Sequence, residues 1–176
     1  MACGMPGNRG LPDVQPHAPP APRQDAPGIS LTTAGTAEAV RQALRQLVAS
    51  PVFLDLPQDL RSSAEIVLAE VLNNIVEHAY AACDGDIHLQ LTFAAPTQTL
   101  ACEIVDTGAP MPGLCLPAGQ SQPLGALNDL PEGGFGWFLI RSLTERLQYD
   151  HAKGENRLTL CLSAGQSASQ TNIVSN

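Results

Sequence analysis

Positive charge is scarce in this sequence and is missing altogether from its middle. The 176 residues include 9 Lys and Arg against 17 Asp and Glu, so the net charge is −8 at pH 7. No Lys or Arg occurs between Arg61 and Arg141. Nucleic acids and anionic membranes bind clustered basic side chains, so the composition argues against direct binding to either. An anionic ligand held by this middle stretch would depend on backbone N–H groups, a helix N-terminus or a metal ion.

Paired cysteine motifs and long apolar runs are also lacking. The five cysteines form no C-x-x-C pair and their number is odd, so neither a zinc site nor a disulfide framework is expected. Cys102 and Cys161 occur in alternating apolar runs, which predicts that both are small core residues. There is no signal-peptide pattern and no apolar run of membrane-spanning length. We therefore expect a cytoplasmic protein.

The length suits one domain, and the composition predicts a tail at each end. Residues 1–28 contain seven prolines and hardly any large apolar side chains, so this segment is predicted to be disordered. Residues 164–176 are rich in Ser, Gln, Asn and Thr, and the same prediction applies. The ordered domain is therefore expected at 29–163.

Apolar periodicity predicts an α/β (α+β) fold. Alternating patterns indicate strands, and apolar residues spaced three and four apart indicate helices. The expected strands are 29–31, 86–94, 100–106 and 157–162, and the expected helices are 36–49, 59–82 with Asp59 as N-cap, and 135–147. A long loop rich in Gly and Pro is expected at 107–133. The expected architecture is a two-layer sandwich in which a mixed, mostly antiparallel sheet is covered by three helices.

A polar ridge interrupts the second predicted helix. Glu70, Asn74 and His78 are spaced four residues apart, which places them on one helix face. Glu can accept a proton and the Asn oxygen is a neutral ligand for Mg²⁺, so the pair suits activation of a hydroxyl beside the metal. Two other interpretations are open: the ridge could be a solvated helix face, and His78 a structural histidine.

Two further motifs follow in the chain. Asp106 ends an apolar strand and Gly108 follows in D-T-G, where a carboxylate can accept from an exocyclic amine and a flat base can approach the backbone. A simple turn would have the same pattern. Next, Gly133, Gly134 and Gly136 open a helix, whose free N–H groups can bind phosphate. That motif has neither the ending of a Walker loop nor the preceding strand of a Rossmann fingerprint, and it is also compatible with a flexible loop before a helix cap.

Together and in this order, the three motifs resemble a known family. E-x-x-x-N with H-A-Y, then D-x-G-x-P, then G-G-x-G-x-F-L-I are similar to the N, G1 and G2 boxes of the GHKL (Bergerat-fold) ATPases. The H-A-Y ending and the segment G-E-N-R-L-T-L at 154–160 resemble the anti-sigma regulatory factor and serine-protein kinase branch in particular. The resemblance covers roughly Ile29 to Leu162.

The resemblance implies ATP and Mg²⁺ as cofactors. It gives Glu70 the role of catalytic base, Asn74 that of Mg²⁺ ligand and Asp106 that of adenine contact. The residues that it places at or beside the nucleotide are Asn73, Asn74, His78, Asp106, Gly108, Gly134 and Gly136. It also implies a STAS-domain anti-anti-sigma protein as substrate, a sigma factor as a further partner, and a homodimer.

One departure from the family pattern concerns the loop at 107–133. Members commonly carry a basic residue there, which would stabilise charge on the transferred phosphate, and this loop has none. Arg141 is the nearest cation in the sequence, and we expect it to pair with a carboxylate. Three functions therefore remain open: a regulatory serine/threonine kinase, a non-catalytic binding module gated by ATP, and the ATPase domain of a histidine kinase.

Overall fold

A five-stranded sheet forms one layer of the molecule. The computed structural model describes residues 27–118 and 135–165, so most of the two predicted tails and of the long loop lies outside the described residues. The strands follow the spatial order β1-β2-β3-β5-β4, with bounds β1 Gly28–Ala34, β2 Asp86–Ala94, β3 Thr99–Asp106, β4 Arg146–Ala152 and β5 Glu155–Ser163. All four pairings are antiparallel, so the expected mixed sheet is antiparallel throughout the described residues.

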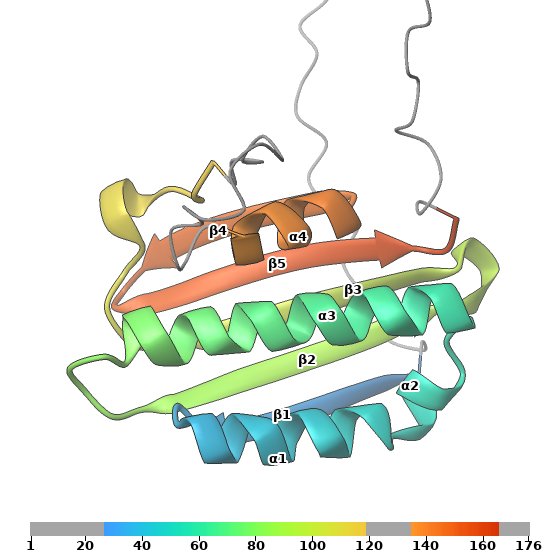
Figure 1. Cartoon of the computed structure of the whole chain (residues 1–176), viewed down its shortest axis with the longest axis horizontal. Helices are drawn as coiled ribbons and strands as arrows, with labels where there is room; N and C mark the ends of the chain where they lie inside the picture. Colours follow the sequence, from blue (N-terminus) through green and yellow to red (C-terminus); the bar gives the residue numbers. More distant parts are fainter. Residues whose placement is uncertain (1–26, 119–134, 166–176) are drawn as a thin grey trace, which may run out of the picture.

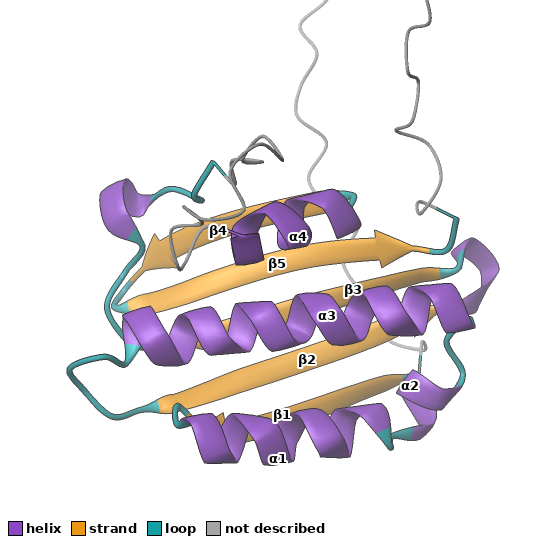
Figure 2. Cartoon of the chain, viewed as in Figure 1, coloured by secondary structure: helices purple, strands orange, loops and turns teal. Residues whose placement is uncertain are grey.

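Helices form the second layer, and they all cover the same face of the sheet (Figure 1; Figure 2). The three longer ones are α1 (Ala37–Val48), α3 (Gln58–Asn74) and α4 (Phe135–Leu143). A short helix, α2 (Pro51–Leu54), lies between α1 and α3, and a π-helical turn, η1 (Ile75–Ala79), continues α3. Two 3₁₀ turns, η2 (Ala95–Thr97) and η3 (Pro112–Leu114), complete the described elements. The two-layer sandwich with three main helices is confirmed.

The core lies between the two layers because each element presents one apolar face. In α3 the buried residues recur at helical spacing, and in the central strands every second residue is buried. The fully covered members include Val67, Leu68, Leu72, Ile87, Leu89, Leu91, Leu100, Ile104 and Leu160. The sheet therefore has a buried helix-covered face and an open face of small and polar residues.

Cys102 and Cys161 fall on opposite faces of the sheet. Cys102 is 1% exposed in the core, as expected, and its burial raises the pKa of the thiol. Cys161 is only half-buried because it alternates with the buried Leu160 and Leu162, so its assignment to the core was wrong. Partial burial raises the pKa of Cys161 as well, against the lowering effect of the Arg146 charge.

The last part of the domain differs most from the sequence-based expectation. The predicted helix 135–147 ends at Leu143, where Thr144 Oγ1 donates to the carbonyl of Ile140 at 2.7 Å. The residues that follow form β4, an edge strand that the prediction missed.

Asp59 is not the N-cap of α3: Pro57 occupies that position, and Asp59 Oδ2 accepts from the N–H of Gly165 at 3.3 Å. None of the described helices is long and apolar enough to cross a membrane.

Candidate nucleotide site

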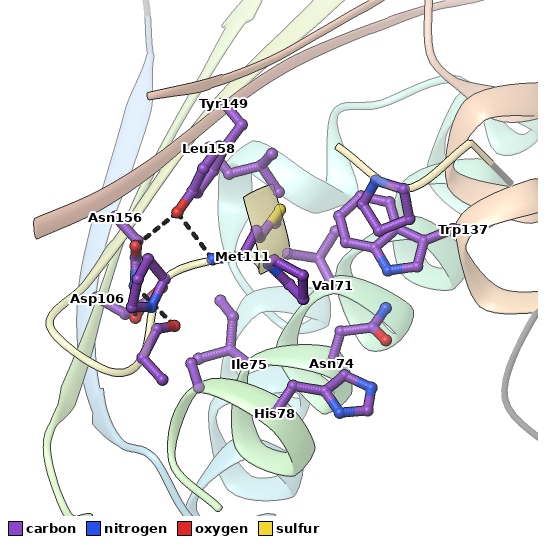
Figure 3. A pocket seen from close by; sticks show the side chains of 15 residues that line it. Val71, Asn74, Ile75, His78, Asp106, Met111, Trp137, Tyr149, Asn156 and Leu158 are labelled. Carbon is purple, nitrogen blue, oxygen red and sulfur yellow. Dashed lines mark hydrogen bonds between the residues drawn. The ribbon is translucent and has the colours of Figure 1, made fainter. Parts of the chain in front are cut away.

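The candidate site is a pocket at one end of the sandwich, between the helix layer and the sheet (Figure 3). Its volume is about 390 Å³, within the range of small-molecule sites. Apolar side chains line most of the wall and a few polar groups converge on it. The lining residues are Val71, Asn74, Ile75, His78, Ala79, Asp106, Ala109, Pro110, Met111, Pro112, Pro117, Trp137, Tyr149, Asn156 and Leu158.

Asp106 supplies the acidic group of the pocket. It ends β3 and is only 5% exposed. Its Oδ1 accepts from the N–H of Gly108 at 2.9 Å and from Nδ2 of Asn156 at 2.7 Å. Among the described residues, no hydrogen bond reaches Oδ2. The carboxylate is thus held through one oxygen, and the other is available to a ligand that donates a hydrogen bond.

Gly108 is required by the close approach of two backbone segments. A Cβ at this position would lie 2.6 Å from the carbonyl oxygen of Ala79. The neighbouring N–H of Ala109 donates to that same oxygen at 2.8 Å. The structure therefore gives Gly108 a packing role against the end of η1, in addition to the base contact that the sequence suggests.

Glu70 and Asn74 come together with Gly136 where α4 packs against α3. A Cβ on Gly136 would lie 2.5 Å from Oε2 of Glu70 and 3.7 Å from Nδ2 of Asn74. The glycine lets the start of α4 come this close while the Glu70 side chain keeps its present position. Glu70 itself does not line the pocket but lies beside it, next to Asn74.

Asn74 has an unsatisfied polar atom at this junction. Its Nδ2 is buried and has no hydrogen-bond partner among the described residues. A buried polar group without a partner costs free energy, so it indicates a ligand or ion that completes its environment. The two ends of a carboxamide exchange by rotation, and its oxygen is a ligand type that Mg²⁺ accepts. The Glu70–Asn74 pair therefore fits a Mg²⁺–phosphate group.

The remaining residues of the predicted set differ in position. His78 lies in the π turn η1 and lines the pocket beside Asn74 (Figure 3). The wider turn, closed by the hydrogen bond from Tyr80 N to Ile75 O, replaces the regular four-residue spacing that the sequence predicts. Asn73 is exposed and does not line the pocket. Gly134 and Gly133 lie outside the described residues, so the phosphate role of Gly134 stays a prediction.

Tyr80, the last residue of the H-A-Y motif, has a structural role. Its ring fills the space between Gly35 and Gly85, where any Cβ would collide with it. Its hydroxyl donates to the carbonyl of Asp86 at 2.7 Å and accepts from the N–H of Thr107 at 3.1 Å. The motif thus ties the end of the η1 turn to the start of β2 and to the loop after β3.

Sequence reasoning missed the polar residues that the β4–β5 hairpin contributes. Asn156 is only 4% exposed and bonds to Asp106, while Tyr149 reaches Asn156 from β4. The sequence contains a signal for Asn156: it alternates in phase with the buried Leu158, Leu160 and Leu162. This alternation predicts a polar side chain at a buried position. Tyr149 could not be found because its strand was not predicted.

Arg141 does not pair with a carboxylate in the described residues. Its Nε donates to the carbonyl oxygen of Pro117 at 2.8 Å, and Pro117 lines the pocket. Arg141 is thereby attached to the loop that follows β3. The sequence has no Lys or Arg between residues 62 and 140.

Comparison with known proteins places this geometry in a family. No curated protein matches the sequence. The fold is similar to a crystal structure of the RsbU and RsbW domains of Rv1364c from Mycobacterium tuberculosis, with 18% identity, a TM-score of 0.53, and coverage of 78% of this chain and 32% of that one. Two structures of a blue-light activated histidine kinase from Erythrobacter litoralis EL346 match at TM-scores of 0.47 and 0.46, with 16% and 15% identity. These two matches cover 73% and 71% of this chain, and 40% and 58% of the chains in the two structures.

The sequence model of one protein family, the histidine kinase-like ATPase domain, matches residues 32–162. All the described residues of the site lie within this range. This range holds Glu70, Asn74 and Asp106 in the order that the GHKL resemblance requires. The fold found above, an antiparallel sheet under helices, agrees with it. The chain belongs to the histidine kinase-like ATPase domain family, the GHKL ATPases.

Proposed function

We propose that the chain is an ATP-dependent regulatory serine/threonine kinase of a partner-switching system, with a STAS-type antagonist as substrate and a sigma factor as second partner. The observation that carries the proposal is the junction of Glu70 and Asn74 with Gly136, beside the pocket that ends on Asp106. The groups proposed for proton transfer, metal binding and purine binding thus lie near one another, with Glu70 beside the pocket and Asn74 and Asp106 in its wall. The similarity to a protein with an RsbW domain supports the fold and is consistent with this choice.

The geometry suggests how each group would act. The base would enter the pocket with its amino group donating to Oδ2 of Asp106, and its faces would contact apolar side chains such as Ile75, Met111 and Leu158. The triphosphate would then extend past Asn74 toward the N-terminus of α4, where helix N–H groups favour negative charge. Bound Mg²⁺, with Asn74 as a ligand, would neutralise part of the phosphate charge.

Glu70 is suited to the proton transfer. As a substrate serine attacks, the new Oγ–P bond forms, the bond from the γ-phosphorus to the bridging oxygen breaks, and ADP leaves. The serine proton moves to the Glu70 carboxylate. The cation that such a reaction usually needs is missing from the long loop, and Arg141 is engaged with Pro117. The protein substrate would therefore supply it, and turnover without the substrate should be slow.

The test is phosphate transfer from labelled ATP to purified STAS-domain proteins of the same organism. Glu70→Gln keeps the size of the side chain and removes the proton acceptor, so we expect ATP affinity to stay within about twofold while transfer falls by ~10²–10⁴-fold. Asn74→Ala should instead weaken Mg²⁺-dependent binding. Glu65→Gln, an exposed carboxylate on the same helix, is the matched control and should change neither quantity.

A second function has its own supporting observation, the absence of Lys and Arg from residues 107–133. On this alternative the chain is a binding module in which ATP gates a protein interface without phosphate transfer. Wild-type protein that binds Mg-ATP but phosphorylates no STAS partner would support the module and overturn the kinase. The homodimer that the resemblance implies belongs to either function, and light scattering at micromolar concentration measures it directly.

A further inference from the structure

The side-chain amide of Asn156 has only one possible orientation. Its Nδ2 faces acceptors: Oδ1 of Asp106 at 2.7 Å and the carbonyl oxygens of Gly108 at 3.1 Å and Ala109 at 3.4 Å. Its Oδ1 accepts from the Tyr149 hydroxyl at 2.7 Å and lies 2.9 Å from Nδ1 of His151. A reversed amide would put its oxygen against the Asp106 carboxylate, which is strongly unfavourable.

This fixed orientation determines which part of Asp106 faces the pocket. Oδ1 already accepts from Asn156 and from the N–H of Gly108, so its hydrogen-bonding capacity is used within the protein. Rotation of the carboxylate would break both bonds in a buried environment. Oδ2 therefore remains the acceptor for the ligand, and an acceptor in a fixed place selects an amino group over a carbonyl group.

Tyr149 connects this pair to the loop that follows β3. Its hydroxyl accepts from the N–H of Met111 at 3.0 Å and donates its single proton to Oδ1 of Asn156. A chain of hydrogen bonds thus runs from the start of the long loop through Tyr149 and Asn156 to the carboxylate (Figure 3). Such chains are cooperative, because each bond polarises the next.

We infer that Tyr149 and Asn156 are positioning residues that set the preference for a 6-amino purine and tie it to the loop after β3. The inference rests on the proposed nucleotide site and names residues outside its three motifs. Within the described residues the Tyr149 hydroxyl has no bond to Asp106 and reaches it only through Asn156. The β4–β5 hairpin therefore controls base selectivity without touching the phosphates.

The experiment compares ATP with purine riboside 5′-triphosphate, which lacks only the 6-amino group. Calorimetry gives both dissociation constants for the full chain and for Asn156→Ala, Tyr149→Phe, the double variant and Thr159→Val. Asn156→Ala should lower the preference for ATP by about 10-fold, the size expected for loss of one hydrogen bond to a charged group, while purine riboside triphosphate binds almost as before. Tyr149→Phe should lower the preference less, by about threefold, and the double variant should equal Asn156→Ala.

The outcomes separate this inference from the proposed function. Equal weakening of both nucleotides by Asn156→Ala or by the near-isosteric Tyr149→Phe would mean a merely structural role and would overturn the inference alone. Additive effects in the double variant would overturn the relay through Asn156. Thr159, on the open face of β5, should give wild-type values as the control. Wild-type protein that binds neither nucleotide would overturn the proposed function, and the inference with it.

Discussion

Two of the buried polar side chains, Asp106 and Asn156, stabilise each other across neighbouring strands. They face one another in the β3–β5 register and share a hydrogen bond of 2.7 Å. A buried carboxylate is tolerated only when donors surround it, and here the donors come from the Gly108 N–H and from a side chain 50 residues away. The loss of either partner should therefore affect the site more than the fold of the distant helices.

At the residue scale, the prediction concerns Asp106→Asn. The change replaces an acceptor by a donor amide at Oδ2 or Oδ1, so the purine amino group or the Asn156 amide loses its acceptor. We expect Mg-ATP to raise the melting temperature of the wild-type protein by mass action, and not that of the variant. The exposed Asp150→Asn on β4 is the control and should respond to nucleotide normally. An undiminished nucleotide shift in Asp106→Asn would remove this residue from the adenine role.

At the scale of elements, the site depends on two close approaches of different kinds. Gly136 brings α4 against the flexible end of the Glu70 side chain, whereas Gly108 brings a loop against the backbone of η1 at Ala79. A side chain can rotate away from an added methyl group, but a backbone carbonyl that already accepts the Ala109 N–H cannot easily do so. The two glycines should therefore respond differently to the same substitution.

We predict opposite profiles for Gly136→Ala and Gly108→Ala. Gly136→Ala should leave the free energy of unfolding nearly unchanged, because the helix preference of alanine, about 0.5–1 kcal/mol, offsets the cost of moving the Glu70 side chain. The displaced Glu70 should lower phosphate transfer by roughly 10-fold. Gly108→Ala should destabilise the fold by about 1–3 kcal/mol through overpacking. Urea unfolding and the transfer assay measure the two effects. A strongly destabilised Gly136→Ala, or a fully stable Gly108→Ala, would contradict this account.

The elements also show how far the sequence could lead. The bounds of α1, β2 and β3 were predicted to within about one residue, because the period of their apolar residues matches their pattern of burial. Strand β4 was missed because Leu143 and Leu147 continue the four-residue spacing of the preceding helix, although the helix ends at Leu143. Glu70, Asn74 and Asp106 could be proposed from the sequence because their motifs are local, whereas the hydrogen bonds of Tyr149 depend on partners that only the folded sheet brings to it.

On the scale of the whole molecule, the described sheet begins before the domain boundary that the composition predicts. The carbonyl of Pro27 accepts from the N–H of Phe93 at 3.1 Å, and β1 begins at Gly28. Gly28 therefore belongs to the sheet and Pro27 is hydrogen-bonded to it, although the predicted tail extends to residue 28. Composition alone cannot detect this, because Pro and Gly carry no apolar signal.

Truncation tests that boundary. Removal of residues 1–26 should leave the melting temperature within about 2 °C of the full chain, since these residues are not expected to add to the core. Removal of residues 1–34 deletes β1 and uncovers the edge of β2, so a fall of more than about 5 °C is expected. Differential scanning calorimetry of the two truncated chains and the full chain decides the point. A large loss on removal of 1–26 alone would show that the N-terminal segment packs on the domain.

The hydrogen bonds between distant residues at the site also have a consequence for folding. Asp106 and Asn156 are 50 positions apart, and Met111 and Tyr149 are 38 apart. Contacts this far apart in the chain form only after a large loss of chain entropy, so they come late. A nascent chain that has emerged only as far as α4 already carries Glu70, Asn74 and Asp106 but lacks the hairpin that orients Asp106. On the proposed function, affinity for ATP would be acquired with the last two strands, and nucleotide binding would distinguish a finished domain from an incomplete one.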